Sequence, residues 1–507
     1  MTRHHPARWS RRRLLGALSS MPALACAGRK LERHPPSVPA SAQISLPVIH
    51  HTQPEGGPSL YLVHDDGLPL VSLAIALRAG YEHAPAEHPG LAGVAASMVL
   101  EGMAGGDRSS LLDRYGDLGT TPGTSTDSSL LLLGCTVHRD DAPAVLRLMA
   151  ENLQQPTMAA PAYARALREH REWSTVARGE PALVTGLGLL AASHGVEPPG
   201  STLGIGTPDT LRGLTREAVG RYLQQHVRLD QAVFLMAGDV DESEAWAWID
   251  RATEGWPAPP SHADGSPDDD SPDPTVPTPT VPTPTVPTPT SEPAPTRSRS
   301  VLVPWPALPQ AFVAVGGPRA PYGDEHEPAQ EVAATLLAST LQYELRTRQR
   351  STYAVQSRVW RTLRGDVRQL WVRVDPQQAG AAVTAVREQL QSLAGDRSFS
   401  ESIVAEVRTG AELQSMLAFH GPEATLGELA RLAATGLPAD TPRRRLEWLR
   451  DVDAGSVADA IRDDVGHDRV CWCVAGDATA LRGAREALPQ GEQLTRSPET
   501  LLGLSSS

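Results

Sequence analysis

Histidine and carboxylate side chains are the first places to look for catalytic chemistry, because they bind metals and move protons. Histidines occur at His50 and His51, at His83 and His88, and at His138, in predicted loops and strand ends. Their spacing is not that of metal ligands, since a zinc-binding helix needs two histidines four residues apart. No Gly-x-Ser-x-Gly nucleophile motif is present either. The residues alone therefore give no reason to expect an autonomous hydrolase.

The cysteines do not form a disulfide framework, because there are only four, at positions 26, 135, 471 and 473. Cys471 and Cys473 are two residues apart on a predicted strand, so both side chains point to one face of a sheet. Strand geometry holds the two thiols parallel instead of converging. We therefore expect two small buried apolar side chains, with a redox pair as the alternative.

The structural elements that must position any site occur twice along the chain. Buried strands are predicted at Leu68–Leu73 and Leu308–Val313, each followed by a loop and a long apolar helix. A later apolar run in each half closes with Ala-Gly-Asp, at Ala237–Asp239 and Ala475–Asp477. Both pairs are about 240 residues apart, which one chance match would not give. The helices are predicted at residues 90–101, 142–153, 163–177, 328–345 and 381–393. We expect an α+β fold with one sheet-plus-helix domain duplicated.

A segment rich in Pro, Thr, Ser and Asp separates the two copies. Within it, Val-Pro-Thr-Pro-Thr occurs three times in tandem between Val276 and Thr290. Proline fixes φ and removes a hydrogen-bond donor, so this segment favours extended polyproline II and cannot pack a core. We expect a semi-rigid spacer, with a ligand for a polyproline-binding domain as the alternative.

The first 26 residues are predicted to be an export signal. Ser10-Arg11-Arg12-Arg13 precedes an apolar run of about a dozen residues, too short to cross a bilayer. This layout is typical of a secretory signal peptide, and the paired arginines resemble a twin-arginine signal. The following Ala23–Cys26 segment resembles a lipoprotein cleavage site that would leave Cys26 acylated; ordinary cleavage nearby is the alternative. We expect export to the bacterial periplasm or envelope, with membrane contact only through a lipid on Cys26.

Composition excludes two broad classes of protein. Hydrophobic residues make up 40% of the 507 residues and charged residues 21%, so most of the chain can bury a core and is not disordered. The formal net charge is −13, which argues against a nucleic-acid partner because such a partner would require a basic face.

Taken together, these features resemble the pitrilysin/insulinase-like zinc peptidases. The resemblance rests on the duplicated α+β pattern, the strand Leu68–Leu73, the following Arg78-Ala79-Gly80, and Pro89-Gly90-Leu91-Ala92 at the start of a helix. It covers roughly residues 50–488 without the linker. It implies that the two homologous domains form a clam-shell half-chamber.

The zinc motif of active family members is lost in this chain. Those members carry H-x-x-E-H on the helix after Gly-Leu-Ala: the histidines bind zinc, and the glutamate activates the zinc-bound water. The matching positions here are Gly93, Ala96 and Ser97. Glu169 and Glu172 lie near the position of the family's downstream glutamate ligand, but one carboxylate cannot hold zinc. The resemblance therefore implies that this chain binds no metal and is inactive alone as a metallopeptidase.

A second family motif is retained in the other half. The run from Leu345 through Arg346 to Tyr353 resembles the C-terminal motif, in which an arginine and a tyrosine reach the zinc site of the facing half or subunit. A guanidinium and a phenol can donate hydrogen bonds to the oxyanion that forms on the scissile peptide. The alternative is a helix-terminal cation and a strand aromatic with no catalytic role. Two positions depart from the family pattern, Thr347 in place of Glu and Arg350 in place of Gly.

The resemblance thus implies a non-zinc-binding subunit of an exported heterodimeric metallopeptidase. A sister subunit with an intact H-x-x-E-H would hold the zinc, and this chain would supply Arg346 and Tyr353 to bind peptide substrates. The alternative is a catalytically inactive envelope scaffold or peptide-binding lipoprotein of the same fold. The expected domains are a signal peptide (1–26), a tether (27–44), a first peptidase-like domain (45–255), the linker (256–299), a second peptidase-like domain (300–490) and a tail (491–507).

Overall fold

The structure is a computed structural model that describes most of the chain from Ser45 onward. It describes residues 45–502 except 86, 195–205, 257–298, 307, 349–351, 361–365, 396–398 and 467–469. The predicted signal peptide with Cys26, the tether and nearly all of the predicted linker lie outside these described residues. In the part of the chain that is described, no helix is both long and apolar enough to cross a membrane.

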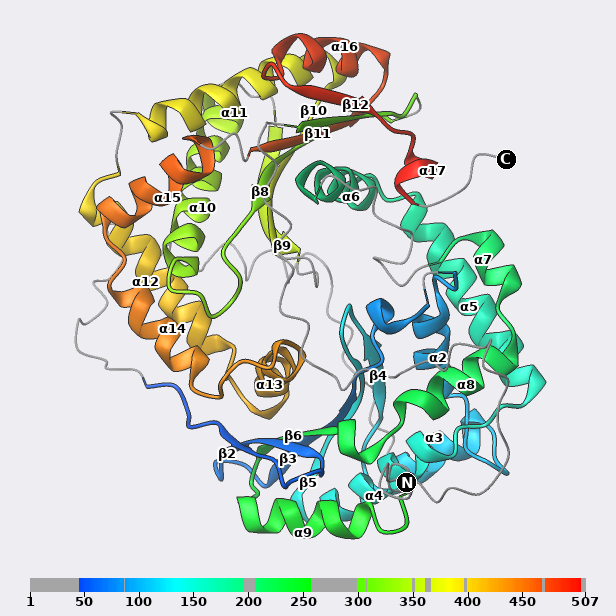
Figure 1. Ribbon diagram of the computed structural model, residues 1–507. Helices are drawn as coiled ribbons and strands as arrows, with labels where there is room; N and C mark the ends of the chain where they lie inside the picture. The colour runs from blue at the N-terminus through cyan, green and yellow to red at the C-terminus, as the bar shows by residue number, and fades with distance from the viewer. Residues whose placement is uncertain are drawn as a thin grey trace, which may run out of the picture. The chain divides into compact units, whose positions relative to one another are not determined.

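The first half of the chain forms a six-stranded mixed sheet with the strand order β1-β2-β6-β3-β5-β4 (Figure 1). Strands β2 and β6 are parallel, and the other neighbours are antiparallel. The strands are β1 His50–Thr52, β2 Ser59–His64, β3 Leu70–Leu77, β4 Gly123–Thr126, β5 Leu131–His138 and β6 Val233–Gly238. The helices are α2 Leu91–Val99, α3 Arg108–Asp117, α4 Ala142–Gln154, α5 Ala160–Arg178, α6 Pro181–His194, α7 Pro208–Gly213, α8 Arg216–His226 and α9 Glu242–Ala252.

The second half forms another six-stranded sheet, with the order β12-β7-β11-β8-β10-β9. Its strands are β7 Arg299–Pro304, β8 Ala311–Pro318, β9 Thr352–Trp360, β10 Val367–Val374, β11 Cys471–Gly476 and β12 Glu492–Thr495. Its helices are α10 Glu327–Gln342, α11 Ala379–Ala394, α12 Glu401–Leu417, α13 Pro422–Thr435, α14 Thr441–Arg450, α15 Ala454–Gly466, α16 Ala478–Ala487 and α17 Pro498–Leu501.

The two sheets confirm the predicted duplication. Strands β2, β3, β4, β5 and β6 occupy the same places, in the same chain order, as β7, β8, β9, β10 and β11. The outermost strand differs: β1 precedes the repeat and is antiparallel to β2, whereas β12 follows it and is parallel to β7. The strands predicted at Leu68 and Leu308 begin slightly later, at Leu70 and Ala311. Leu70 directly follows Pro69, and Ala311 comes two residues after Pro309; a proline cannot donate to a strand ladder.

Each half lends one helix to the other half's sheet. Helix α6 packs on β7, β8 and β11, while α13 packs on β2, β3 and β6. Cys471 and Cys473 are buried free thiols in the core beneath α6, which confirms the expectation of two small buried side chains. Gly188 of α6 lies against Cys473, where a Cβ would collide with the sulfur. The small residues therefore let the exchanged helix approach the sheet closely.

Candidate functional site

Helix α2 carries Gly93, Ala96 and Ser97, the positions that the sequence resemblance matches to the zinc motif, and its start explains the Pro-Gly-Leu-Ala frame. Gly90 caps the helix with a φ of 94°, in the left-handed region. A Cβ at this position would lie 2.6 Å from Cδ2 of Leu211. Glycine is therefore required here both for backbone conformation and for space. The frame is a structural requirement for entering the helix, independent of metal binding.

The three degenerate positions on α2 offer no metal ligand. Gly93 and Ala96 are buried, and Ser97 is half-buried with its Oγ donating a hydrogen bond to the Gly93 carbonyl oxygen at 3.1 Å. Glu169 and Glu172 are exposed on α5, and Glu169 lies 3.7 Å from Nη1 of Arg108. This donor set does not fit zinc, because the family site needs two imidazoles on one helical face.

A buried carboxylate just after α2 binds one arginine of α3 and one of α5, a cluster that the sequence analysis missed. The Glu101 side chain is 1% exposed and accepts hydrogen bonds from Arg108 at 3.1 Å and from Nε of Arg165 at 2.7 Å. A carboxylate at the end of an otherwise apolar helix was the signal that could have revealed it. Guanidinium–carboxylate contacts thus join the end of α2 to α3 and α5.

Among the described residues, two histidines from distant parts of the chain pack together. His83 and His226 have ring centroids 6.0 Å apart, and Tyr222 packs on His226. Burial, and secondly the neighbouring His83, lower the pKa of His226 to about 4. Within the described ranges, no group of three or more His, Cys, Asp or Glu side chains is arranged to hold a metal ion.

Arg346 lies in an irregular backbone segment. Helix α10 ends at Gln342 and continues as a π-helical turn over Tyr343–Arg348. Within this turn Leu345 is buried in the core, whereas Arg346 is exposed. π-Helical turns are rare and are found frequently at functional sites, because the wider turn changes the direction of the following side chains.

Tyr353 lies in a second irregular segment. Strand β9 pairs regularly with β10 as far as Val355, opposite Val372, but the next pair is Thr352 with Val374. Tyr353 and Ala354 therefore stand opposite a single residue, which is the arrangement of a β-bulge. The π-helical turn and β9 contact each other, so the elements that carry Arg346 and Tyr353 are neighbours. Arg350, where the family has glycine, lies outside the described residues.

A groove of about 1000 Å³ follows the edge of the first sheet. Strand β4 pairs on one side with β5 and is the last strand in the order of its sheet. The opposite wall is α13 of the second half. Most of the polar lining consists of hydroxyl groups, contributed by Thr120, Thr121, Thr124, Ser125 and Thr136. An unpaired strand edge in a hydroxyl-lined groove can accept an extended peptide.

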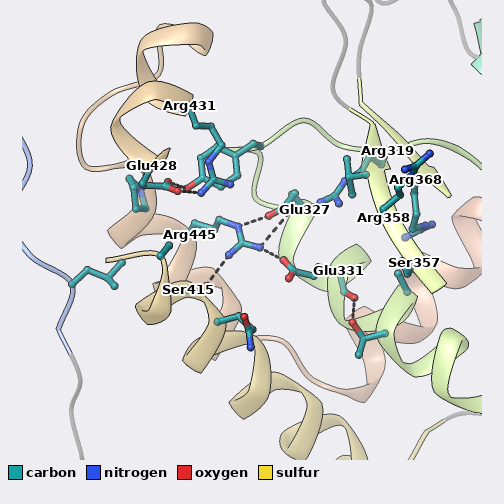
Figure 2. A pocket seen from close by; sticks show the side chains of 18 of the residues that line it. Arg319, Glu327, Glu331, Ser357, Arg358, Arg368, Ser415, Glu428, Arg431 and Arg445 are labelled. Atoms are coloured by element: carbon teal, nitrogen blue, oxygen red, sulfur yellow. Dashed lines mark hydrogen bonds and ion pairs between the residues drawn. The ribbon is translucent and has the colours of Figure 1, made fainter. Parts of the chain in front are cut away.

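A smaller pocket, of about 340 Å³, lies among helices of the second half (Figure 2). Arg445 donates to Glu327 at 2.6 Å and also pairs with Glu331, and Arg319 pairs with Glu327 (Figure 2). Burial alone would raise the pKa of Glu327, but Arg445 and Arg319 outweigh it and hold the pKa below its usual value. Since the guanidinium groups already have carboxylate partners, we interpret this cluster as structural support.

Comparisons with known proteins agree with this architecture. The family model described as "Peptidase M16 inactive domain" matches residues 213–410. The structure resembles a peptidase M16 inactive domain from Pseudomonas fluorescens, with TM-score 0.70, 15% identity and coverage of 85% of this chain and 98% of that one. It also resembles a protease from Helicobacter pylori, with TM-score 0.71, 13% identity and coverage of 85% and 100%.

A third similar structure is the first half of the periplasmic protease PqqL from Escherichia coli. Its TM-score is 0.63 at 15% identity, over 91% of this chain and 97% of that one. No curated protein sequence matches this chain significantly. Residues 213–410 thus match the peptidase M16 inactive-domain family, and the described chain has the duplicated fold of the M16 inactive-domain structure that it resembles.

Proposed function

We propose that this chain is the non-zinc-binding subunit of an exported heterodimeric zinc metallopeptidase. The observation that carries the proposal is the contrast between two sites. The positions matched to the zinc motif hold Gly93, Ala96 and Ser97, which offer no imidazole or carboxylate. Arg346, by contrast, is exposed on a turn that contacts the strand of Tyr353. A chain of this kind lacks the metal and keeps groups that act on a neighbour's metal site.

In this proposal Arg346, Tyr353 and strand β4 each contribute to peptide cleavage. Zinc on the sister subunit supplies the activated water. The Arg346 guanidinium and the Tyr353 phenol donate hydrogen bonds to the oxygen of the scissile peptide as it gains negative charge. The edge of β4 pairs with the extended substrate. The two domains of this chain form half of a chamber, which the sister subunit closes.

The location follows from the leader and from one relative. The sequence begins with the features of an export signal, and the similar PqqL half is described as part of a periplasmic protease. We propose that the chain acts in the bacterial periplasm or envelope. A lipid on Cys26 would hold it at the membrane.

The second candidate function is a catalytically inactive envelope scaffold or peptide-binding lipoprotein. The open edge of β4 along its groove favours this alternative, because peptide binding there needs neither zinc nor Arg346. The two candidates differ in two requirements. Only the peptidase subunit needs a zinc-bearing partner, and only its activity depends on the Arg346 side chain.

Recovery of partners from the envelope of the source organism tests the proposal. The full chain with a C-terminal tag is expressed at its native level, extracted and purified, and an unrelated tagged envelope protein serves as the control. We expect one stoichiometric chain with H-x-x-E-H, and peptide hydrolysis by the complex that chelation abolishes. Recovery of the chain alone, or with proteins that lack this motif, would contradict the peptidase proposal.

A further inference from the structure

One side chain connects the two irregular segments that carry Arg346 and Tyr353. The Oε1 atom of Gln342, the last residue of α10, accepts a hydrogen bond from the Val355 backbone N–H at 2.8 Å. Gln342 immediately precedes the π-helical turn, and Val355 immediately follows the bulge in β9. The bond therefore joins the start of one irregularity to the end of the other.

The hydrogen bond from Val355 to Gln342 lies at the edge of the second sheet. Strand β9 is the edge strand of the second sheet and pairs with β10 alone in that sheet. An N–H at the edge of a sheet has no neighbouring strand to bind, so a side-chain acceptor can fix it. Val355 also packs against the second-half core, beside which α10 lies. Gln342 thus holds β9 to the helix where regular pairing with β10 is interrupted.

We infer that Gln342 is a positioning residue that fixes the β9 backbone at Tyr353 relative to the turn that carries Arg346. This inference rests on the proposed function, in which both groups must meet one developing oxyanion. Catalytic donors act only when held close to the productive geometry, and small displacements cost up to about 100-fold in rate. Without the Gln342 bond, the bulge and the turn would still be in contact but would lose the side-chain hydrogen bond that fixes their relative position.

The first experiment measures the bond itself in the full mature chain. Hydrogen–deuterium exchange of the peptide that covers β9 is compared for wild type, Gln342→Leu and Gln342→Glu. Leucine removes the acceptor, so we expect at least about 10-fold faster exchange at the start of β9; glutamate keeps an acceptor and should restore slow exchange. Thr340→Val is the matched control, since it removes a 2.8 Å hydrogen bond confined to α10. Equal exchange in Gln342→Leu and wild type would overturn the inference.

The second experiment separates positioning from simple stability. Peptide turnover is measured with the co-purified sister subunit for the same variants and for Arg346→Ala. We expect Gln342→Leu to lower kcat about 10- to 100-fold with KM little changed, and Gln342→Glu to recover most of the rate. A slow Arg346→Ala with an unaffected Gln342→Leu would refute the role of Gln342 and leave the proposed function intact. Unaffected turnover in Arg346→Ala would instead refute the proposed function itself.

Discussion

The edge strands β4 and β9 occupy the same place in the two sheets, yet they are built differently. Strand β4 pairs with β5 in a continuous register and lies along a groove. Strand β9 has a bulge at Tyr353, and the N–H of Val355 beside it is bound by Gln342. The helices that follow the equivalent strands β3 and β8 differ in the same way. Helix α2 is regular and presents Gly93 and Ala96, whereas α10 ends in a π-helical turn with an exposed arginine.

The two copies therefore share a strand order but differ in local backbone structure at the equivalent edge strands and helices. In the first half, the positions that we match to the family's zinc motif hold small residues, of which Gly93 and Ala96 are buried and Ser97 is half-buried. In the second half, backbone irregularities persist beside the retained arginine. π-Helical turns and bulges disrupt regular hydrogen bonding and are frequent at functional sites, so their position beside Arg346 and Tyr353 makes these residues the ones to test. Five predictions test or refine this contrast.

The largest expected effect comes from the buried charges of the second half. Replacing Arg445 by methionine leaves Glu327 and Glu331 without their main guanidinium partner, which should cost about 3–5 kcal/mol of unfolding free energy. The matched change in the first half is Arg108→Met. The Arg108 side chain is 44% exposed, and Glu101 keeps its hydrogen bond from Arg165 when Arg108 is replaced. That variant should lose at most about 1 kcal/mol. Equal losses in urea unfolding would show that the two networks do not differ in importance.

Arg346→Ala should reduce the rate of peptide hydrolysis by the complex without weakening the association of the two subunits. Removal of one donor to an oxyanion typically costs about 10²–10³ in kcat. Arg462→Ala is the control, since Arg462 is a largely exposed arginine paired with Asp459 at 2.7 Å. Steady-state hydrolysis measured with the recovered sister subunit, alongside sedimentation to follow assembly, checks both parts. Full activity in Arg346→Ala would favour the scaffold alternative.

Two glycines at helix starts should differ in their tolerance of alanine. Gly90 of the first half has a φ of 94° and a Cβ there would lie 2.6 Å from Leu211, so Gly90→Ala should cost about 2–3 kcal/mol. Gly421 of the second half has a φ of 87° with no atom within 4 Å of a Cβ. Gly421→Ala should therefore meet no steric contact, and its cost of about 1–3 kcal/mol should come from backbone strain alone, because a φ of 87° with a ψ of 166° is rarely adopted by other residues. Thermal unfolding of both variants decides whether space at the α2 cap matters.

The stability of the protein should depend on pH through Glu327. Its pKa is lower in the folded state, because Arg445 and Arg319 outweigh the effect of burial. The stabilising contribution is thus fully present above the unfolded carboxyl pKa, about 4.3, and is lost as pH falls through the folded value. Glu327→Gln should have a flatter stability profile between neutral and acidic pH. Parallel profiles for wild type and variant would mean that other carboxylates cause the acid sensitivity.

The smallest expected effect is that of chelation on the isolated chain. Since α2 carries no zinc ligand, we expect EDTA to shift the Tm by less than about 1 °C, whereas removal of a bound stabilising metal would lower it. Metal analysis of the purified chain is the accompanying measurement. A stoichiometric metal, or a clear fall in Tm, would mean that the first half binds a metal through residues not recognised here.

The sequence predicted the regular elements well because their signals are local. Helix α4 spans Ala142–Gln154 against a predicted 142–153, and the repeated Ala-Gly-Asp runs are strands β6 and β11 with their turns. The match of Gly93, Ala96 and Ser97 to the zinc motif stays a prediction; it rests on the Pro-Gly-Leu-Ala frame, which depends on the left-handed Gly90. The assignment of Arg346 and Tyr353 stays a prediction, since it rests on a motif match.

The sequence by itself thus determined the two α+β copies, because apolar periodicity is written residue by residue. Tertiary structure decided which helix covers which sheet: α6 and α13 are exchanged between halves, and no local pattern encodes a distant partner. It also decided the Gln342–Val355 bond and the pairing of Arg445 with Glu327, 118 residues apart. These interactions join positions whose separation in the chain carries no periodic signal, so they emerge only when the chain is packed.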